Sequence, residues 1–212
     1  TTQHSKARLG VAEDKTKAAM QKDPRLVSMR ALAGVSLLPT NQLTSFEERL
    51  DKLRSCASLV DSELAASPVC PHCNFRPANE QGDMLPAANV LKQLDDELDR
   101  LLENWVRTLV ENLEDPIIQS NFELLKETYR EIVSGFAKSG RLPDMVTPEF
   151  IAAIQEALSG LEKITVTGED IKQALLQGGS PATPEDLRKR FETLLNNRCK
   201  GKDMTKLRFV VE

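Results

Sequence analysis

An apolar residue recurs every three or four positions along Leu91-Lys-Gln-Leu94-Asp-Asp-Glu-Leu98-Asp-Arg-Leu101-Leu-Glu-Asn-Trp105-Val-Arg-Thr-Leu109. Residues at this spacing share one face of an α-helix, and such a face packs along a partner helix. The acidic run Asp95-Asp-Glu-Leu-Asp99 lies between the seam positions and is expected to be solvated. We therefore predict one long helix that begins at Pro86 and ends at Asp115-Pro116.

Similar seams lie on both sides of this helix in the sequence. The earlier seam consists of Leu43, Phe46, Leu50, Leu53, Ala57, Val60 and Leu64, and the later one of Ile118, Phe122, Leu125, Tyr129, Ile132 and Phe136. A break near Asp61 would leave Cys56 close to a helix end, and Gly140 ends the later helix. Three such helices joined by short breaks predict an antiparallel helical bundle or a coiled-coil hairpin.

The last third of the chain has a different pattern. Three threonines, each followed by Pro or Gly and then Glu, are expected to cap helices at about 148–161, 168–177 and 184–197: Thr147, Thr167 and Thr183. Gly178-Gly179 would end the middle helix. Strands at 163–167 and 207–211 could pair across the last two helices, which would make a small β-α-α-β cap.

The fold class expected from these patterns is mostly α. Only 4% of the residues are aromatic, and few aromatics with many Leu, Glu and Lys favour helices. We expect a basic N-terminal helical arm at residues 1–40, in which Asp23 caps a helix starting at Pro24. A helical bundle at 41–140 would carry a cysteine knuckle at 68–77, and residues 141–212 would form the cap.

The overall composition bounds the environment of the protein. The net charge of −4 argues against non-specific binding of nucleic acid by the whole chain. No apolar run is long enough to span a membrane, and no secretory leader can be recognised. Four cysteines with one close pair do not resemble a disulfide framework, so a cytoplasmic location is expected. The start at Thr1 rather than Met suggests processing or a chain cut from a longer one.

The segment Pro68-Val-Cys-Pro-His-Cys-Asn-Phe-Arg-Pro77 carries the most specific chemistry. Cys70 and Cys73 have the spacing of half a tetrahedral zinc site, in a tight turn followed by Asn74, which tolerates left-handed geometry. The sequence therefore predicts a structural zinc ion. Its other ligands would come from Cys56, the best third candidate, from Cys199, a weaker fourth, or from His4, His72 or a second chain.

Three alternatives remain for this segment. The cysteines could be buried without metal, or two chains could share zinc as a hook at the tip of a coiled-coil hairpin. The third alternative is a thiol redox protein, because Cys70-Pro-His-Cys73 matches the active-site tetrapeptide of periplasmic disulfide oxidases. That chemistry needs a helix running through the second cysteine, whereas Pro77 follows closely and no βαβ pattern surrounds the motif.

A basic helix offers a second function. Two predicted helices followed by a strand resemble a winged-helix layout. The second of these helices carries Arg188, Lys189 and Arg190, which could contact DNA phosphates. A solvated helix face explains the same residues. No phosphate-binding loop, nucleophile elbow or metalloprotease motif is present, so we expect this region not to be an enzyme and to bind no small-molecule substrate.

Several segments together resemble one family. They are Ala7–Val11, Asp23–Leu26, Leu53–Cys56, Pro68–Pro77, Gly178–Pro181, Leu187–Phe191 and Gly201 to Glu212. These look like the C-terminal region of the very large P-loop ATPases of BREX (phage-exclusion) and phage-growth-limitation loci. The resemblance implies a bacterial antiviral system in which this piece is a non-catalytic scaffold, associating with itself or with other components. The nucleotide-binding motifs of that family would lie upstream, and Asn74 stands where Gly is more usual.

Overall fold

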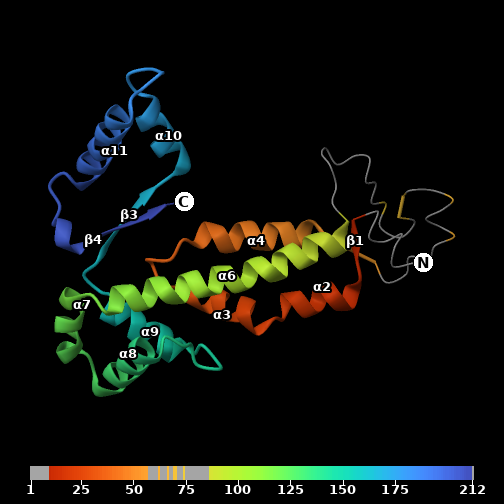
Figure 1. The fold of residues 1–212 in the computed structure, drawn as a ribbon. Coiled ribbons are helices and arrows are strands. Elements are labelled where there is room, and N and C mark those ends of the chain that lie inside the picture. The colour runs from red at the N-terminus through yellow and green to blue at the C-terminus, as the bar shows by residue number, and fades with distance from the viewer. Residues whose placement is uncertain are drawn as a thin grey trace. The chain divides into compact units, whose positions relative to one another are not determined.

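A computed structural model describes residues 10–56 and 86–211, and residues 62, 66, 69, 70 and 74 between them. The expected mostly helical fold is confirmed (Figure 1). The elements are β1 (Val11–Ala12), α2 (Asp14–Gln21), α3 (Pro24–Leu32), α4 (Thr40–Lys52), β2 (Arg54–Ser55), α6 (Ala87–Leu113), α7 (Pro116–Asn121), the 3-10 turn η2 (Phe122–Leu124), α8 (Glu127–Ser139), α9 (Pro148–Ala157), β3 (Glu162–Val166), α10 (Gly168–Leu176), α11 (Pro184–Cys199), the 3-10 turn η3 (Met204–Lys206) and β4 (Leu207–Val211).

These elements group into two compact units. The first unit contains the chain up to Arg30 together with Gln42–Val106, and the second contains Ala31–Asn41 together with the chain from Arg107 onward. Within the first unit, side chains of α3 bind α6, and within the second unit, α8 packs on α9. The division into three segments at 1–40, 41–140 and 141–212 stays a prediction.

In the first unit, α4 and α6 lie side by side (Figure 1). Apolar residues of both helices are buried, and two contacts show that the helices run antiparallel. Early in α4, the side-chain oxygen of Gln42 accepts a 3.0 Å hydrogen bond from Trp105, which lies late in α6. Late in α4, Arg49 forms a 2.6 Å ion pair with Glu97, which lies earlier in α6. The predicted seam residues of α6 that are buried are Leu91, Leu94, Leu98, Trp105 and Leu109.

Arg25 joins the start of α3 to α6. Its guanidinium donates to both carboxylate oxygens of Asp23 and also binds Asp95 at 2.5 Å and Asp99 at 2.8 Å. The acidic run of α6 was expected to be only a solvated face. Instead, two of its carboxylates lie beside a cation, although their side chains stay more than half exposed.

Helix α4 ends earlier than its apolar seam predicts. It stops at Lys52, and the chain enters β2, which pairs in parallel with β1. Lys17 of α2 donates to the carbonyls of Asp51 and Leu53, which lack helical donors at this end. The expected position of Cys56 at a helix end is therefore wrong, because Cys56 follows a strand. The later seam positions Ala57, Val60 and Leu64 lie outside the described residues.

In the second unit, the helix predicted from Pro116 to Gly140 is interrupted. After α7 and η2, Leu125 is extended with ψ 150°, and α8 begins two residues later. Arg130 of α8 covers the break by donating to the carbonyls of Phe122, Glu123 and Leu125. Within α8, Val133 and the predicted seam residue Phe136 are buried, whereas the predicted seam residue Ile132 is half-buried.

The three predicted threonine N-caps all form. The hydroxyls of Thr147, Thr167 and Thr183 accept from backbone N–H groups of Phe150, Asp170 and Asp186, and the last two pairs are capping boxes. Strands β3 and β4 pair in parallel, from Glu162 with Leu207 to Val166 with Val211. A parallel pair needs a long crossover, which α10 and α11 provide.

An ion pair holds β4 at the end of α6. Arg208 binds Asp115 at 2.6 Å and donates to the side chain of Asn112 at 2.8 Å. Asp115 also accepts from the backbone of Ile117, so one carboxylate both caps α7 and holds the strand. Of the helices in the described ranges, none combines the length and apolar character needed to cross a bilayer.

The Asp23–Arg25 contact predicts a pH dependence of stability. The side-chain hydrogen bonds from Arg25 lower the pKa of the Asp23 carboxyl below its ordinary value. A carboxyl with a lowered folded-state pKa stabilises the protein fully above its unfolded pKa, about 3.9, and loses this contribution as the pH falls through the folded value. We expect Asp23→Asn, which can still cap α3, to be less stable than wild type at pH 7 and to approach it below about pH 4.

Urea unfolding followed by the fluorescence of Trp105, which is buried in the first unit, measures this difference. Asp96→Asn is the matched control, because Asp96 is exposed on α6 and belongs to none of the ion pairs described for the first unit. An Asp23→Asn deficit that stays constant with pH would show that the carboxylate charge contributes nothing.

Candidate functional site

Two of the predicted zinc ligands lie together in the first unit. The Sγ atoms of Cys56 and Cys70 are 3.8 Å apart. This separation is far longer than the roughly 2.05 Å of a disulfide, so the two sulfurs are in contact but not bonded. Cys70 is buried, with 2% of its surface exposed, and Cys56 is half-buried.

The backbone around each cysteine is constrained. Cys56 follows β2, where Ser55 donates to Asp14 at the start of α2 and pairs with Ala12 of β1. Beyond Cys70, the N–H of Asn74 returns to the Cys70 carbonyl at 2.9 Å. Asn74 has φ +57°, the left-handed conformation that the sequence analysis expected at this position.

The other predicted ligands are Cys73, His72, His4 and Cys199. Cys73, His72 and His4 lie outside the described residues. Within the described ranges, no group of three or more His, Cys, Asp or Glu side chains converges. Cys199 is 6% exposed in the second unit and packs with Ile164, Val166 and Leu207, so its position is that of an apolar core residue.

The geometry bears on two of the alternatives for the cysteine segment. A redox helix running through the second cysteine is not favoured, because Asn74, the next residue, has a positive φ. A two-chain hook would use only the Cys-X-X-Cys pair. It would leave unexplained why Cys56 of the same chain touches Cys70.

The three basic residues of α11 have different surroundings. Arg190 donates to the carbonyls of Leu175 at 2.6 Å and Gly179 at 3.0 Å, and so satisfies the C-terminal end of α10. Its guanidinium packs against Gly178, where a Cβ would lie 3.2 Å from it and where φ is +90°. Arg188 forms an exposed ion pair with Glu185, and Lys189 is exposed.

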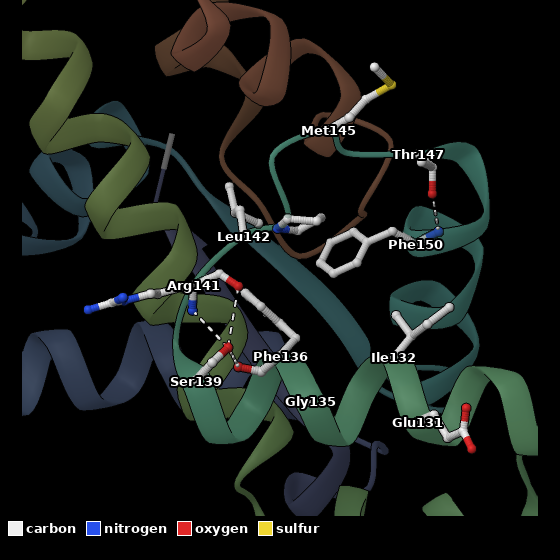
Figure 2. A pocket seen from close by; sticks show the side chains of 11 residues that line it. Glu131, Ile132, Gly135, Phe136, Ser139, Arg141, Leu142, Met145, Thr147 and Phe150 are labelled. Atoms are coloured by element: carbon white, nitrogen blue, oxygen red, sulfur yellow. Dashed lines mark hydrogen bonds between the residues drawn. The ribbon is translucent and has the colours of Figure 1, made fainter.

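A groove in the second unit is a site that the sequence analysis missed. It lies between α8 and α9 and under the loop that joins them, has a volume of about 500 Å³ and is open on one side (Figure 2). Its lining is mainly apolar, from Ile132, Phe136, Leu142, Pro143, Met145 and Phe150. The rings of Phe136 and Phe150 meet edge to face, with centroids 5.3 Å apart, and form its floor.

The loop over the groove is held at both ends. Ser139 Oγ accepts from the backbone N–H of Arg141, and Thr147 caps α9 through Phe150 (Figure 2). Met145 on this loop is 74% exposed. The sequence signal that could have predicted the groove is the run Leu142-Pro-Asp-Met145, which follows the helix-ending Gly140. Apolar residues exposed in a short loop indicate a contact surface.

The surroundings of α11 predict different effects of two similar substitutions. Arg190→Ala removes two charge-assisted hydrogen bonds to carbonyls, so we expect a loss of about 1–2 kcal/mol in the free energy of unfolding. Arg188→Ala removes only an exposed ion pair and should change it by less than about 0.5 kcal/mol. Denaturant unfolding followed by circular dichroism compares the two variants. Equal effects would contradict the capping role of Arg190.

Arg188→Ala, together with Lys189→Ala, also tests whether α11 contacts nucleic acid. If α11 binds DNA phosphates, Arg188→Ala and Lys189→Ala should weaken salt-dependent binding of a DNA duplex while leaving stability intact. If the helix has no such role, binding is absent in wild type as well.

Comparison with known proteins identifies one relationship. Residues 12–104 match the family described as "Family of unknown function (DUF6079) 6th domain". The match runs from Ala12, the second residue of β1, through most of α6, and it includes both Cys56 and Cys70. No curated protein and no solved structure matches the chain.

Proposed function

We propose that this chain is a non-catalytic assembly module that binds an amphipathic helix of another protein in the groove between α8 and α9. The observation that carries this proposal is the groove itself. It is open and mainly apolar, and it contains Met145, an exposed residue of a type common on protein-binding surfaces. An apolar groove on a helical surface is a recurring way of binding the apolar face of a partner helix.

The dimensions and charges of the groove favour a helical occupant. The helical part of its wall, from Glu131 to Ser139, is about 12 Å long, which matches about two turns of a partner helix. Glu131 lies at one end and Arg141 at the other (Figure 2). A partner helix with a basic residue at the Glu131 end and an acidic residue at the Arg141 end would be complementary in charge.

The resemblance to the C-terminal region of phage-defence ATPases supplies the proposed setting. In that setting the module acts in the bacterial cytoplasm, and its partner is another component of the same defence system. The helical bundle of the first unit and the β-α-α-β arrangement of the second serve as the framework. No step of nucleotide hydrolysis is assigned to these residues, because the motifs for it belong upstream in that family.

The two rival functions have less support. Arg190, one of the three residues proposed for DNA contact, is already used to satisfy the end of α10. The redox function needs a helix through Cys73, and the left-handed Asn74 opposes one.

The proposal predicts the effect of a charge placed in the groove. Met145→Glu buries a carboxylate against the partner helix, so we expect binding to weaken at least about tenfold. Leu176→Glu is the matched control, because Leu176 is 57% exposed on α10 and does not line the groove. Binding to each separately purified protein of the same defence locus, measured by titration calorimetry, gives the two affinities.

Several outcomes would overturn the proposal. If wild type is a monomer that binds no component of the locus, the assembly function fails. If Met145→Glu binds as well as wild type, the groove is not the site. If light scattering shows self-association that only Met145→Glu disrupts, the occupant is a second copy of this chain instead.

A further inference from the structure

We infer that Cys56 and Cys70 are two ligands of one structural zinc ion, which fastens the first unit where its secondary structure is weakest. Zinc binds thiolates at about 2.3 Å in a tetrahedral arrangement, which places two sulfurs about 3.8 Å apart. The observed Sγ–Sγ distance is 3.8 Å. This inference concerns the first unit and is independent of the groove in the second.

Two thiols in van der Waals contact would have nearly the same Sγ–Sγ distance as two thiolates bound to one zinc ion. The turn beyond Cys70 is therefore the observation that favours a metal. The N–H of Asn74 closes back on the Cys70 carbonyl, and Asn74 is left-handed. A non-glycine residue in this conformation is uncommon, and it persists where the surroundings hold it. A Cys-X-X-Cys knuckle calls for this turn. Cys73, which the spacing in the sequence suggests as a further ligand, lies outside the described residues.

Burial also fits a structural rather than a catalytic ion. Cys70 is 2% exposed, and Cys56 is shielded in part where the chain leaves β2. Cys199 belongs instead to the apolar cluster of the second unit. Burial in that cluster gives Cys199 a packing role, whereas contact with Cys70 favours Cys56 as the ligand.

A zinc ion would stabilise this region because the strands beside it are very short. Strands β1 and β2 are two residues long each, and a pair so short is marginal alone. A metal bridge from the end of β2 to Cys70 would close the intervening chain and hold β2 against β1. Because ligands must be gathered on folding, the binding free energy of zinc would add to the stability of the first unit, to which Cys56 and Cys70 belong.

The chain carries its own reporters for this effect. It has one Trp and one Tyr. Trp105 is 1% exposed in the first unit, and Tyr129 lies on α8 of the second. Chelation should therefore shift the emission of Trp105 to longer wavelength and change the signal of Tyr129 less.

The experiment uses the whole chain, purified without added metal. Elemental analysis should find one zinc per chain, and Co²⁺ exchanged into the site should show the absorption of a tetrahedral thiolate complex. Cys56→Ala and Cys70→Ala should each lose zinc and the Trp105 signal, whereas Cys199→Ala should keep both. Cys73→Ala tests the ligand named by the spacing.

Metal-free wild type with four titratable thiols and no response to chelator or added zinc would overturn the inference. So would zinc retained in both Cys56→Ala and Cys70→Ala. A disulfide between Cys56 and Cys70 in metal-free purified protein would also overturn the inference, because the two sulfurs would then be bonded to each other instead of to zinc. A failure of Met145→Glu to affect partner binding leaves all of these readouts unchanged, so the two proposals fail separately.

Discussion

Burial of the apolar seam of α6 is the interaction on which the rest of the structure depends. This helix contributes to both units, so its one face must be covered by different neighbours along its length. In the first unit, α4 lies against it antiparallel, and Trp105 combines apolar burial with a hydrogen bond to Gln42. Farther along, Leu109 and Leu113 are fully buried in the second unit. Loss of this seam would leave the shorter helices without a surface to pack on.

Arginine side chains then fix how the ends of elements meet. Arg25 holds the start of α3 against α6, Arg208 holds β4 at the end of α6, and Arg190 satisfies the end of α10. Each uses the planar fork of the guanidinium to reach two or more acceptors, a geometry that lysine does not offer. These contacts are partly exposed, so they specify arrangement more than they add stability.

The two proposed sites lie in different units and have different physical bases. The cysteine pair depends on backbone conformation, since the left-handed Asn74 and the short strand β2 bring two thiols together from separate segments. The groove depends on what the fold leaves uncovered, since α8 and α9 pack through Phe136 and Phe150 but not beyond them. The match to a domain family of unknown function covers the cysteines and not the groove.

Local signals in the sequence determined the helices, their threonine caps, the seam of α6 and the turn residue Asn74, because spacing and capping act within a few residues. Tertiary structure decided where a helix ends although its apolar seam continues in the sequence. Helix α4 ends at Lys52 because β1, far away in the sequence, pairs with the residues that follow. The acidic run of α6 looked merely solvated until the fold placed Arg25 beside it. The contact between Cys56 and Cys70, the apolar cluster around Cys199 and the groove beside α8 likewise follow only from how distant segments pack.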